Sequence, residues 1–188
     1  MEKVMTVTGY KSYELNIAKL SDPKIFFIKE ALRKAIIAFI ENGGEWILIS
    51  GQLGVELWAA EVIRDLRDNY EIKYAVIPPF DEQEKRWSEG EQEMYQKIVA
   101  EADFFQLLYQ GPYQGPFQFK AKNKWLLEKS DASLILVDEE FPGSVQYYLD
   151  IAKQEEKHNS YSIYYLTPFD LEEIVREWNE NNNNLLNE

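Results

Sequence analysis

The sequence contains no cysteine and only one histidine, His158, and these shortages exclude several kinds of chemistry. Without cysteine the chain forms no disulfide, offers no thiolate to a metal and has no catalytic thiol. A single histidine in a polar stretch gives no assignable Ser/His/Asp arrangement and too few ligands for zinc. We therefore expect no metal site.

Positive charge is also scarce, because 20 Lys and Arg residues face 33 Asp and Glu residues, for a net charge of −13. A protein that coats nucleic acid needs a basic surface to neutralise phosphates, so we do not expect nucleic acid as a partner. A small anion held by backbone amides is still compatible with this charge. No run approaches the roughly 20 apolar residues of a membrane helix, and the N-terminus does not resemble a signal peptide. The expected location is the cytoplasm.

What the sequence does contain is a regular alternation of strand-like and helix-like segments. The strand-like runs are Val4–Thr8, Trp46–Ser50, Tyr74–Ile77, Phe104–Tyr109, Ala132–Val137 and Ser162–Leu166. The segments with helical spacing are Pro23–Glu41, Val55–Asp68, part of 81–102, Phe117–Glu128 and Ser144–Glu155. This order predicts an α/β fold with an open, mostly parallel sheet and helices on both faces.

The domain organisation follows from length and composition. Hydrophobic residues make up 45% of the chain, which is enough to bury a sizeable core. No repeat or shift in composition marks a second domain, so residues 1–178 are expected to form a single one. Residues 179–188 include four consecutive asparagines and are expected to be a disordered tail.

The turn from Ser50 to Glu56 is the strongest candidate for chemistry, because ligands of open parallel sheets bind beyond the carboxyl ends of the strands. Gly51 and Gly54 stand there between a buried strand and a helix, so backbone N–H groups and the helix dipole can face an anion. Alternatively, the glycines only permit a tight connection and Glu56 complements the dipole. No Walker lysine and no G-x-G-x-x-G is present, so P-loop ATP hydrolysis is not expected.

The turn after the first strand carries groups of a similar kind. Thr8 and Gly9 end the strand, and Tyr10 and Lys11 follow them. They offer a hydroxyl, a stacking ring and a cation beside the first turn. An ordinary loop is the alternative interpretation.

A third group of candidates lies later in the chain. Lys120, Lys122 and Lys124 form a locally positive patch around Asn123, for which a solvated helix surface is the alternative. The pair 143–144, Gly-Ser, opens a helix after a strand, so it is either a phosphate cradle or a routine helix start.

Four segments carry a resemblance to a known family: Thr8–Leu15, Glu45–Glu61, Pro112–Asn123 and Lys129–Asp138. Up to about residue 178 the chain resembles the YpsA-like family of uncharacterised bacterial proteins. That family is similar to a Rossmann-like superfamily, called SLOG, which includes the DNA-processing protein DprA and the LOG (Lonely Guy) cytokinin-activating enzymes. The resemblance implies a Rossmann-like fold and a nucleotide pocket centred on Gly51, Gly54 and Glu56.

The departures from these relatives narrow what the resemblance implies. LOG enzymes carry P-G-G-x-G-T-x-x-E before a late helix, whereas Pro142–Tyr147 here places Tyr147 where the catalytic glutamate would stand. Phosphoribohydrolase activity is therefore not implied. Glu56, which stands where the DprA branch usually has Asp, is the only catalytic candidate, and whether the chain is an enzyme stays open.

The leading hypothesis is a cytoplasmic sensor that binds a nucleotide or a derivative such as NAD or ADP-ribose. Its expected ligand-binding residues are Thr8, Gly9, Tyr10, Lys11, Ser50, Gly51, Gln52, Gly54, Glu56, Lys122, Asn123, Gly143 and Ser144. One alternative is a hydrolase of an N-glycosidic or phosphate bond, with Glu56 as general base or ribose anchor. Another, implied by the resemblance, is a protein partner of the cell-division or stress machinery. A homo-oligomer is expected by analogy with related folds.

Overall fold

The computed structural model describes residues 1–185 and contains one six-stranded sheet. Its strands are β1 (Val4–Gly9), β2 (Trp46–Ile49), β3 (Lys73–Val76), β4 (Phe104–Phe105), β5 (Ala132–Leu136) and β6 (Ser162–Leu166). They lie in the order β4-β3-β2-β1-β5-β6, and every neighbouring pair is parallel. The expected parallel α/β sheet is confirmed.

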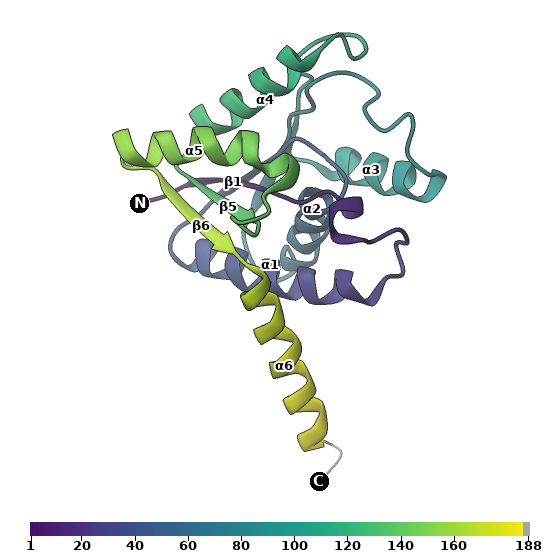
Figure 1. Cartoon of the computed structure of the whole chain (residues 1–188), viewed down its shortest axis with the longest axis vertical. Helices are drawn as coiled ribbons and strands as arrows, with labels where there is room; N and C mark the ends of the chain where they lie inside the picture. The colour runs from purple at the N-terminus through teal and green to yellow at the C-terminus, as the bar shows by residue number, and fades with distance from the viewer. Residues whose placement is uncertain (186–188) are drawn as a thin grey trace.

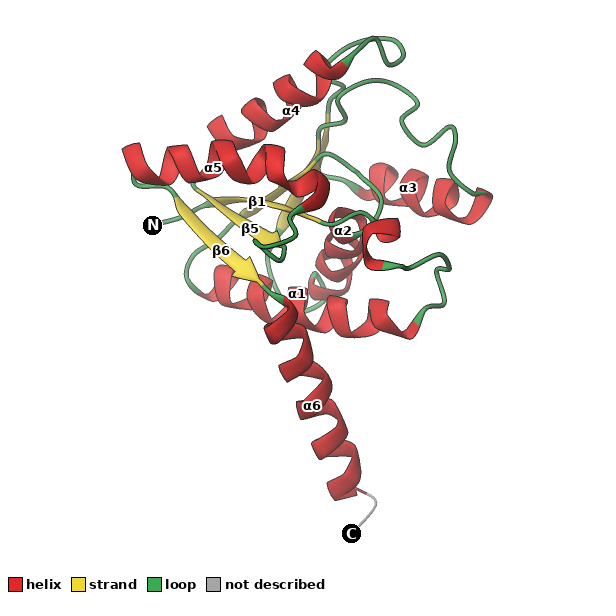
Figure 2. Ribbon diagram, viewed as in Figure 1, coloured by secondary structure: helices red, strands yellow, loops and turns green. Residues whose placement is uncertain are grey.

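Helices cover both faces of this sheet (Figures 1 and 2). The helices are α1 (Pro23–Glu41), α2 (Val55–Leu66), α3 (Glu89–Glu101), α4 (Pro116–Glu128), α5 (Gln146–His158) and α6 (Pro168–Leu185), with short 3-10 turns η1 (Ser12–Leu15) and η2 (Gly143–Val145). On one side α1 packs against α2 and α2 against α3, while α4 and α5 pack together on the other side. No helix of the described residues combines the length and the apolar character that crossing a membrane requires.

The strand order places a change of direction between β1 and β5. From β1 the chain adds β2, β3 and β4 outward on one side, and it then returns to add β5 and β6 on the other side of β1. In open α/β sheets such a point opens a crevice at the carboxyl ends of the strands. The loops that follow β1 and β5 flank this point.

The central strands are buried on both faces, and buried hydroxyls fix the helices above them. All residues of β5 are buried, as are residues 5–9 of β1. The Thr6 hydroxyl donates to the Leu126 carbonyl of α4 over 3.2 Å. The Ser133 hydroxyl bonds the hydroxyls of Tyr148 in α5 and Tyr161 at 2.6 and 2.5 Å. Because buried polar groups are satisfied, these contacts fix where α4 and α5 lie on the sheet.

The C-terminal region differs from the sequence prediction. Residues 179–185, which were expected to be disordered, continue α6, and residues 186–188 of that expected tail lie outside the described part of the chain. The reason is a short apolar stripe at helical spacing, Leu171, Ile174 and Trp178, that packs on α1. The Trp178 ring lies 4.8 Å from that of Phe26. Beyond this contact α6 projects from the body (Figure 1).

The bounds of β4 and α3 also differ from the predicted ones. The strand expected at Phe104–Tyr109 is only the two residues of β4, because the chain then turns into a long loop. The helix expected within 81–102 begins at Glu89, where Ser88 and Glu91 form a reciprocal capping box. The preceding residues form turns rather than a helix.

Candidate functional site

Glu56 lies at the carboxyl ends of β1 and β2, and its carboxylate joins the two strands. One oxygen, Oε1, accepts hydrogen bonds from the backbone N–H of Ser50 at 2.7 Å and from the Ser50 hydroxyl at 2.8 Å. The other, Oε2, accepts from the Thr8 hydroxyl at 3.1 Å. Glu56 is 2% exposed, so both oxygens face protein rather than the crevice. This geometry gives Glu56 a positioning role in place of the predicted contact with a ribose hydroxyl.

The glycines of the same turn allow close packing of backbone on backbone. Gly54 has φ of +98°, and a Cβ there would lie 2.5 Å from the carbonyl oxygen of Tyr10. The next residue, Val55, donates its N–H to that carbonyl over 3.2 Å. The loop after β1 is therefore held against the N-terminus of α2, and Gly54 is required for this approach. Gly9 is equally confined, between β5 and α2.

Behind the turn, Gly51 is enclosed by the region that follows β3. Its φ is +82°, and a Cβ there would lie 2.8 Å from the Tyr95 ring of α3. The Gln83 amide donates to the Ser50 carbonyl over 2.8 Å. Gln52, at the tip of the turn, is half-buried. For Gly51 the geometry explains the tight connection without a ligand.

Tyr10 links the loops after β1 and β5 and is not an open stacking ring. It is 8% exposed, and its hydroxyl accepts from the Asp138 N–H at 2.9 Å and donates to the Phe141 carbonyl at 2.5 Å. Burial raises the pKa of the Tyr10 hydroxyl, an effect that the backbone hydrogen bond from Asp138 partly opposes. The predicted stacking role is therefore corrected to a structural one.

The predicted phosphate cradle at Gly143 and Ser144 is filled by a carboxylate of the chain itself. Glu14 accepts from the Ser144 N–H at 2.9 Å, the Ser144 hydroxyl at 2.6 Å and the Lys11 N–H at 3.0 Å. Burial alone would raise the pKa of Glu14, but these hydrogen bonds and the Lys11 charge outweigh it and lower the pKa. At the start of the α5 region the donors of Ser144 therefore bind the Glu14 carboxylate.

Lys122 lies over the carboxyl end of β1. Leu126 contacts Thr6 of that strand, and Lys122 precedes Leu126 by one turn of α4. Four helical residues rise by about 6 Å, close to the length of two strand residues, so Lys122 reaches the level of Thr8. The charges of Glu56 and Lys11 both act on its ammonium group.

The Lys122 ammonium is nearly buried and lacks a partner. The residue is 8% exposed, and burial lowers its pKa, which the Glu56 charge raises in part and the Lys11 charge lowers further. Within residues 1–185 no acceptor forms a hydrogen bond or ion pair with it, and its Nζ lies 5.9 Å from the centroid of the Phe119 ring. The same residues contain no fully enclosed side-chain nitrogen or oxygen without a partner, so Nζ keeps an opening to solvent.

The comparisons with known proteins agree with this fold. The family model described as the YspA SLOG family matches residues 5–171. The chain belongs to the YpsA family. It is 48% identical over 176 residues to the UPF0398 protein YpsA of Bacillus subtilis, a match that covers 93% of this chain and 98% of the relative. It is 46% identical over 175 residues to a UPF0398 protein of Oceanobacillus iheyensis, covering 93% and 94%.

A solved structure from another bacterium shares the fold of this chain. The structure is that of DNA processing protein A from Helicobacter pylori, which is described as having a unique mode of binding single-stranded DNA. The TM-score is 0.56 with 13% sequence identity, and the match covers 95% of this chain and 81% of that one. At this identity the likeness establishes the fold alone.

In this member of the YpsA family, only some of the predicted site residues come together. Thr8, Ser50 and Glu56 come together as one buried polar cluster, and Lys122 lies near it. Asn123 is half-buried beside Lys122 in sequence, without a contact that assigns it a role. Whether these residues bind a ligand stays a prediction. The described residues contain no cluster of three or more His, Asp or Glu side chains suited to a metal ion.

Sequence reasoning missed Glu14. Its partner Ser144 is 130 residues away, so no local pattern reveals the contact. The one local signal is the spacing Lys11-x-x-Glu14, which is that of a side chain returning to the backbone at a helix start.

A separate hollow lies away from this site in the family member described here. It has a volume of about 550 Å³ and lies between α1 and the strands β5 and β6. Its lining is mostly apolar, with Phe39, Leu134 and Tyr164 among the contributors and no Lys or Arg side chain among its described residues. A phosphate has no cationic side chain to meet there, so this hollow does not compete with the Lys122 site.

Proposed function

We propose that the chain is a cytoplasmic protein that binds a nucleotide or nucleotide derivative, with a phosphate beside Lys122 at the carboxyl end of β1. The observation that carries this proposal is the nearly buried, unpartnered Lys122 ammonium with its opening to solvent. Burying a charge without a partner costs free energy. A nearly buried charge of this kind is a candidate for function, because a bound anion would offset the cost.

The electrostatics around Lys122 favour an anion over a cation. Lys11, on the neighbouring loop, acts on the same ammonium, and neither lysine forms an ion pair with a carboxylate of the described residues. In a chain of net charge −13, two such lysines form a local exception. The change of strand direction between β1 and β5 also supports a ligand at this edge.

The inward orientation of Glu56 favours binding over hydrolysis. Both carboxylate oxygens accept hydrogen bonds from Ser50 and Thr8, and Glu56 is 2% exposed, so its carboxylate is shielded from the water that a general base would activate. A sensor is therefore favoured over the alternative of a hydrolase. Release of a free base or ribose phosphate from a bound nucleotide would reverse this preference.

Single-stranded DNA is the second candidate ligand, since a protein of similar fold is described as binding it. DNA and free nucleotides share the phosphate and the base, so Lys122 alone does not separate them. The net charge of −13 disfavours a long polyanion, because few basic groups are available to release its counterions. We therefore favour the small nucleotide and include an oligonucleotide in the test.

Isothermal calorimetry tests the proposal with AMP, ADP, ATP, NAD, ADP-ribose and an oligothymidine as probes. We expect at least one of the small nucleotides to bind with Kd below about 1 mM, a free energy on the order of −4 kcal/mol. Lys122→Met should abolish this binding. Lys124→Met, on the same helix but 74% exposed at its side chain and paired with Glu128, should leave it unchanged.

The outcomes separate the candidates. Binding of the oligothymidine alone would replace the nucleotide by single-stranded DNA. No binding by any of the six probes would refute the proposal, as would equal binding by the wild type and Lys122→Met.

A further inference from the structure

Three aromatic rings form a cluster next to Lys122. Phe80 comes from the loop after β3, Tyr113 from the loop after β4, and Phe119 from the first turns of α4. The Phe80 ring centroid lies 5.3 Å from that of Tyr113 and 5.6 Å from that of Phe119, and the last two are 5.6 Å apart. We call these three residues the aromatic cluster.

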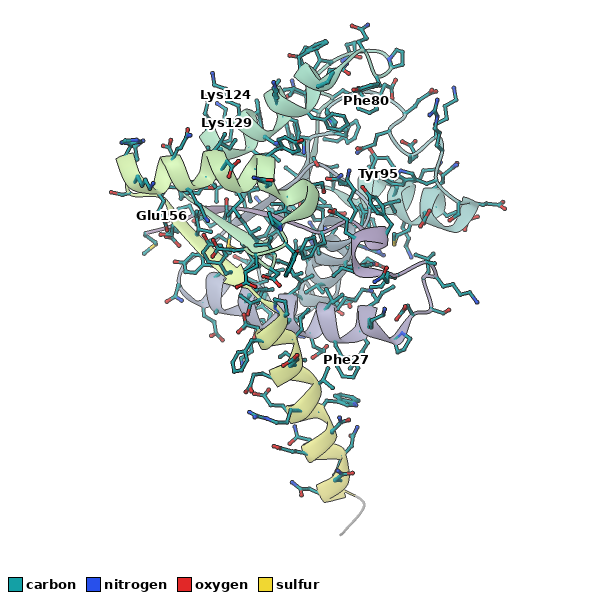
Figure 3. The ribbon with its side chains drawn as sticks, viewed as in Figure 1. Phe27, Phe80, Tyr95, Lys124, Lys129 and Glu156 are labelled. Carbon is teal, nitrogen blue, oxygen red and sulfur yellow. The ribbon has the colours of Figure 1, made fainter. Side chains whose placement is uncertain are left out.

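The aromatic cluster is open to solvent although its rings are large and apolar. Tyr113 is 50% exposed, Phe119 is 38% exposed, and Phe80 is half-buried. In Figure 3, Phe80 of this cluster lies on one side of α4 and Lys124 on the other. Exposed rings gathered at one place present an apolar surface that a ligand can cover.

Hydrogen bonds hold the backbone beneath the aromatic cluster. The Asp81 N–H donates to the Gly111 carbonyl over 2.9 Å, which ties the two loops together. Gln118 is 1% exposed and fixes the second loop to α4, because its amide accepts from the Gln114 N–H at 2.8 Å and donates to the Pro112 carbonyl at 3.3 Å. The rings are thus carried on a braced backbone, which lowers the ordering cost of binding.

The Lys122 ammonium lies next to the aromatic cluster. Nζ of Lys122 lies 5.9 Å from the Phe119 ring centroid. Both lie at the carboxyl ends of the strands, since the loops after β3 and β4 supply two of the rings and α4 begins at the same edge. A ring next to a cation matches a nucleotide, in which a ribose separates a flat base from its phosphate.

We propose that the aromatic cluster is the base-binding subsite, where the base of a nucleotide stacks while its phosphate meets Lys122. This inference rests on the proposed function, and it specifies that the ligand must carry an aromatic base. Stacking on exposed rings is tolerant of base identity, because every base offers a π-face. The subsite therefore selects nucleotides over sugar phosphates and discriminates little among bases.

The test compares two ligands that differ only at C1′: AMP, which carries adenine, and ribose 5-phosphate, which carries a hydroxyl. We expect the wild type to bind AMP about tenfold more tightly than ribose 5-phosphate, the scale of one stacked base. Phe119→Leu should remove this difference by weakening AMP about tenfold while leaving ribose 5-phosphate unchanged. Lys122→Met should abolish the binding of both ligands.

Phe117→Leu is the matched control. Phe117 lies on the same helix and is 47% exposed, but its ring pairs with Tyr109 at 5.4 Å instead of the aromatic cluster. Its replacement should not change the affinity for AMP. Tyr113→Ser, at a half-exposed loop position, is a second variant in case Phe119→Leu lowers stability, and it should also weaken AMP selectively.

The outcomes distinguish the two proposals. If the wild type binds AMP and ribose 5-phosphate equally, or if Phe119→Leu and Tyr113→Ser leave AMP binding intact, the base subsite is refuted while the phosphate site stands. An equal loss in Phe119→Leu and the Phe117→Leu control also contradicts the subsite. If no nucleotide binds to the wild type at all, the proposed function itself fails.

Discussion

Replacing Lys122 by methionine should stabilise the protein while abolishing nucleotide binding. Lys122 is 8% exposed and has no hydrogen-bond or ion-pair partner in the described chain, so its charge is held in the fold at a cost. Methionine keeps an unbranched stem of similar length and removes the charge. Removing a poorly compensated buried charge stabilises a fold by about 1 kcal/mol or more.

This gain converts into a measurable shift of the melting temperature. For a chain of 188 residues, about 1 kcal/mol corresponds to a rise in Tm of roughly 2 to 4 °C. Calorimetric melting of the unliganded wild type and of Lys122→Met measures it. The control Lys124→Met removes an exposed pair with Glu128 at 3.7 Å, worth about 0.3 to 0.5 kcal/mol, and should not raise the Tm.

The pH dependence gives an independent check with a defined sign. The pKa of Lys122 is lowered in the folded state, so between this value and its ordinary value the unfolded chain binds more protons. The stability of the wild type relative to Lys122→Met should therefore rise as the pH increases through that window. A Lys122→Met protein that melts at or below the wild type, with no such pH-dependent difference, would refute the reasoning.

Three further predictions concern the framework of the site. Gly54→Ala should lower the free energy of unfolding by more than about 2 kcal/mol in a denaturant titration, because a Cβ at φ of +98° meets the Tyr10 carbonyl. Gly111 also has a positive φ but lies in open space, so Gly111→Ala should lower it by only about 1 kcal/mol. Glu56→Ala should lower the free energy of unfolding by about 3 kcal/mol, because it leaves the buried donors of Ser50 and Thr8 unpaired. Glu56→Gln should lower it less and should retain nucleotide binding. Loss of binding in a folded Glu56→Gln variant would contradict the positioning role of Glu56. The pKa of Glu14 is lowered in the folded state, so its carboxylate should add to the free energy of unfolding above its unfolded pKa, and this contribution should vanish as the pH falls through the folded pKa. The difference in unfolding free energy between the wild type and Glu14→Gln measures it. A difference that persists in acid would contradict this prediction.

The hydrophobic periodicity of the sequence predicts most helices and strands, because residues within each segment determine them. The bounds expected for Pro23–Glu41 and Ser162–Leu166 coincide with those of α1 and β6. Apolar spacing, a capping Asp22 and the following glycines determine α1 without reference to the rest of the chain. Composition predicts disorder for residues 179–185, but they are helical because the earlier part of α6 packs on α1, and composition does not reveal that contact.

The site was predicted only in part, because its decisive features depend on contacts between distant segments. Lys122 was noticed as part of a lysine patch, but its burial and lack of a partner follow from the packing of α4 on β1. The sequence points to Glu56 as central to the turn, but it does not reveal that the carboxylate is oriented toward Thr8 and Ser50. Tyr10 was expected to be open, whereas its hydroxyl bonds the loop after β5.

The most direct test of the central claim is a crystal structure of the chain grown with ADP. The account predicts a phosphate oxygen at hydrogen-bond distance, about 3 Å, from Nζ of Lys122 at the carboxyl end of β1. It also predicts the adenine against the rings of Phe80, Tyr113 and Phe119. Bound ADP that leaves Lys122 without a phosphate contact, for example in the apolar hollow between α1 and β6, would contradict the account.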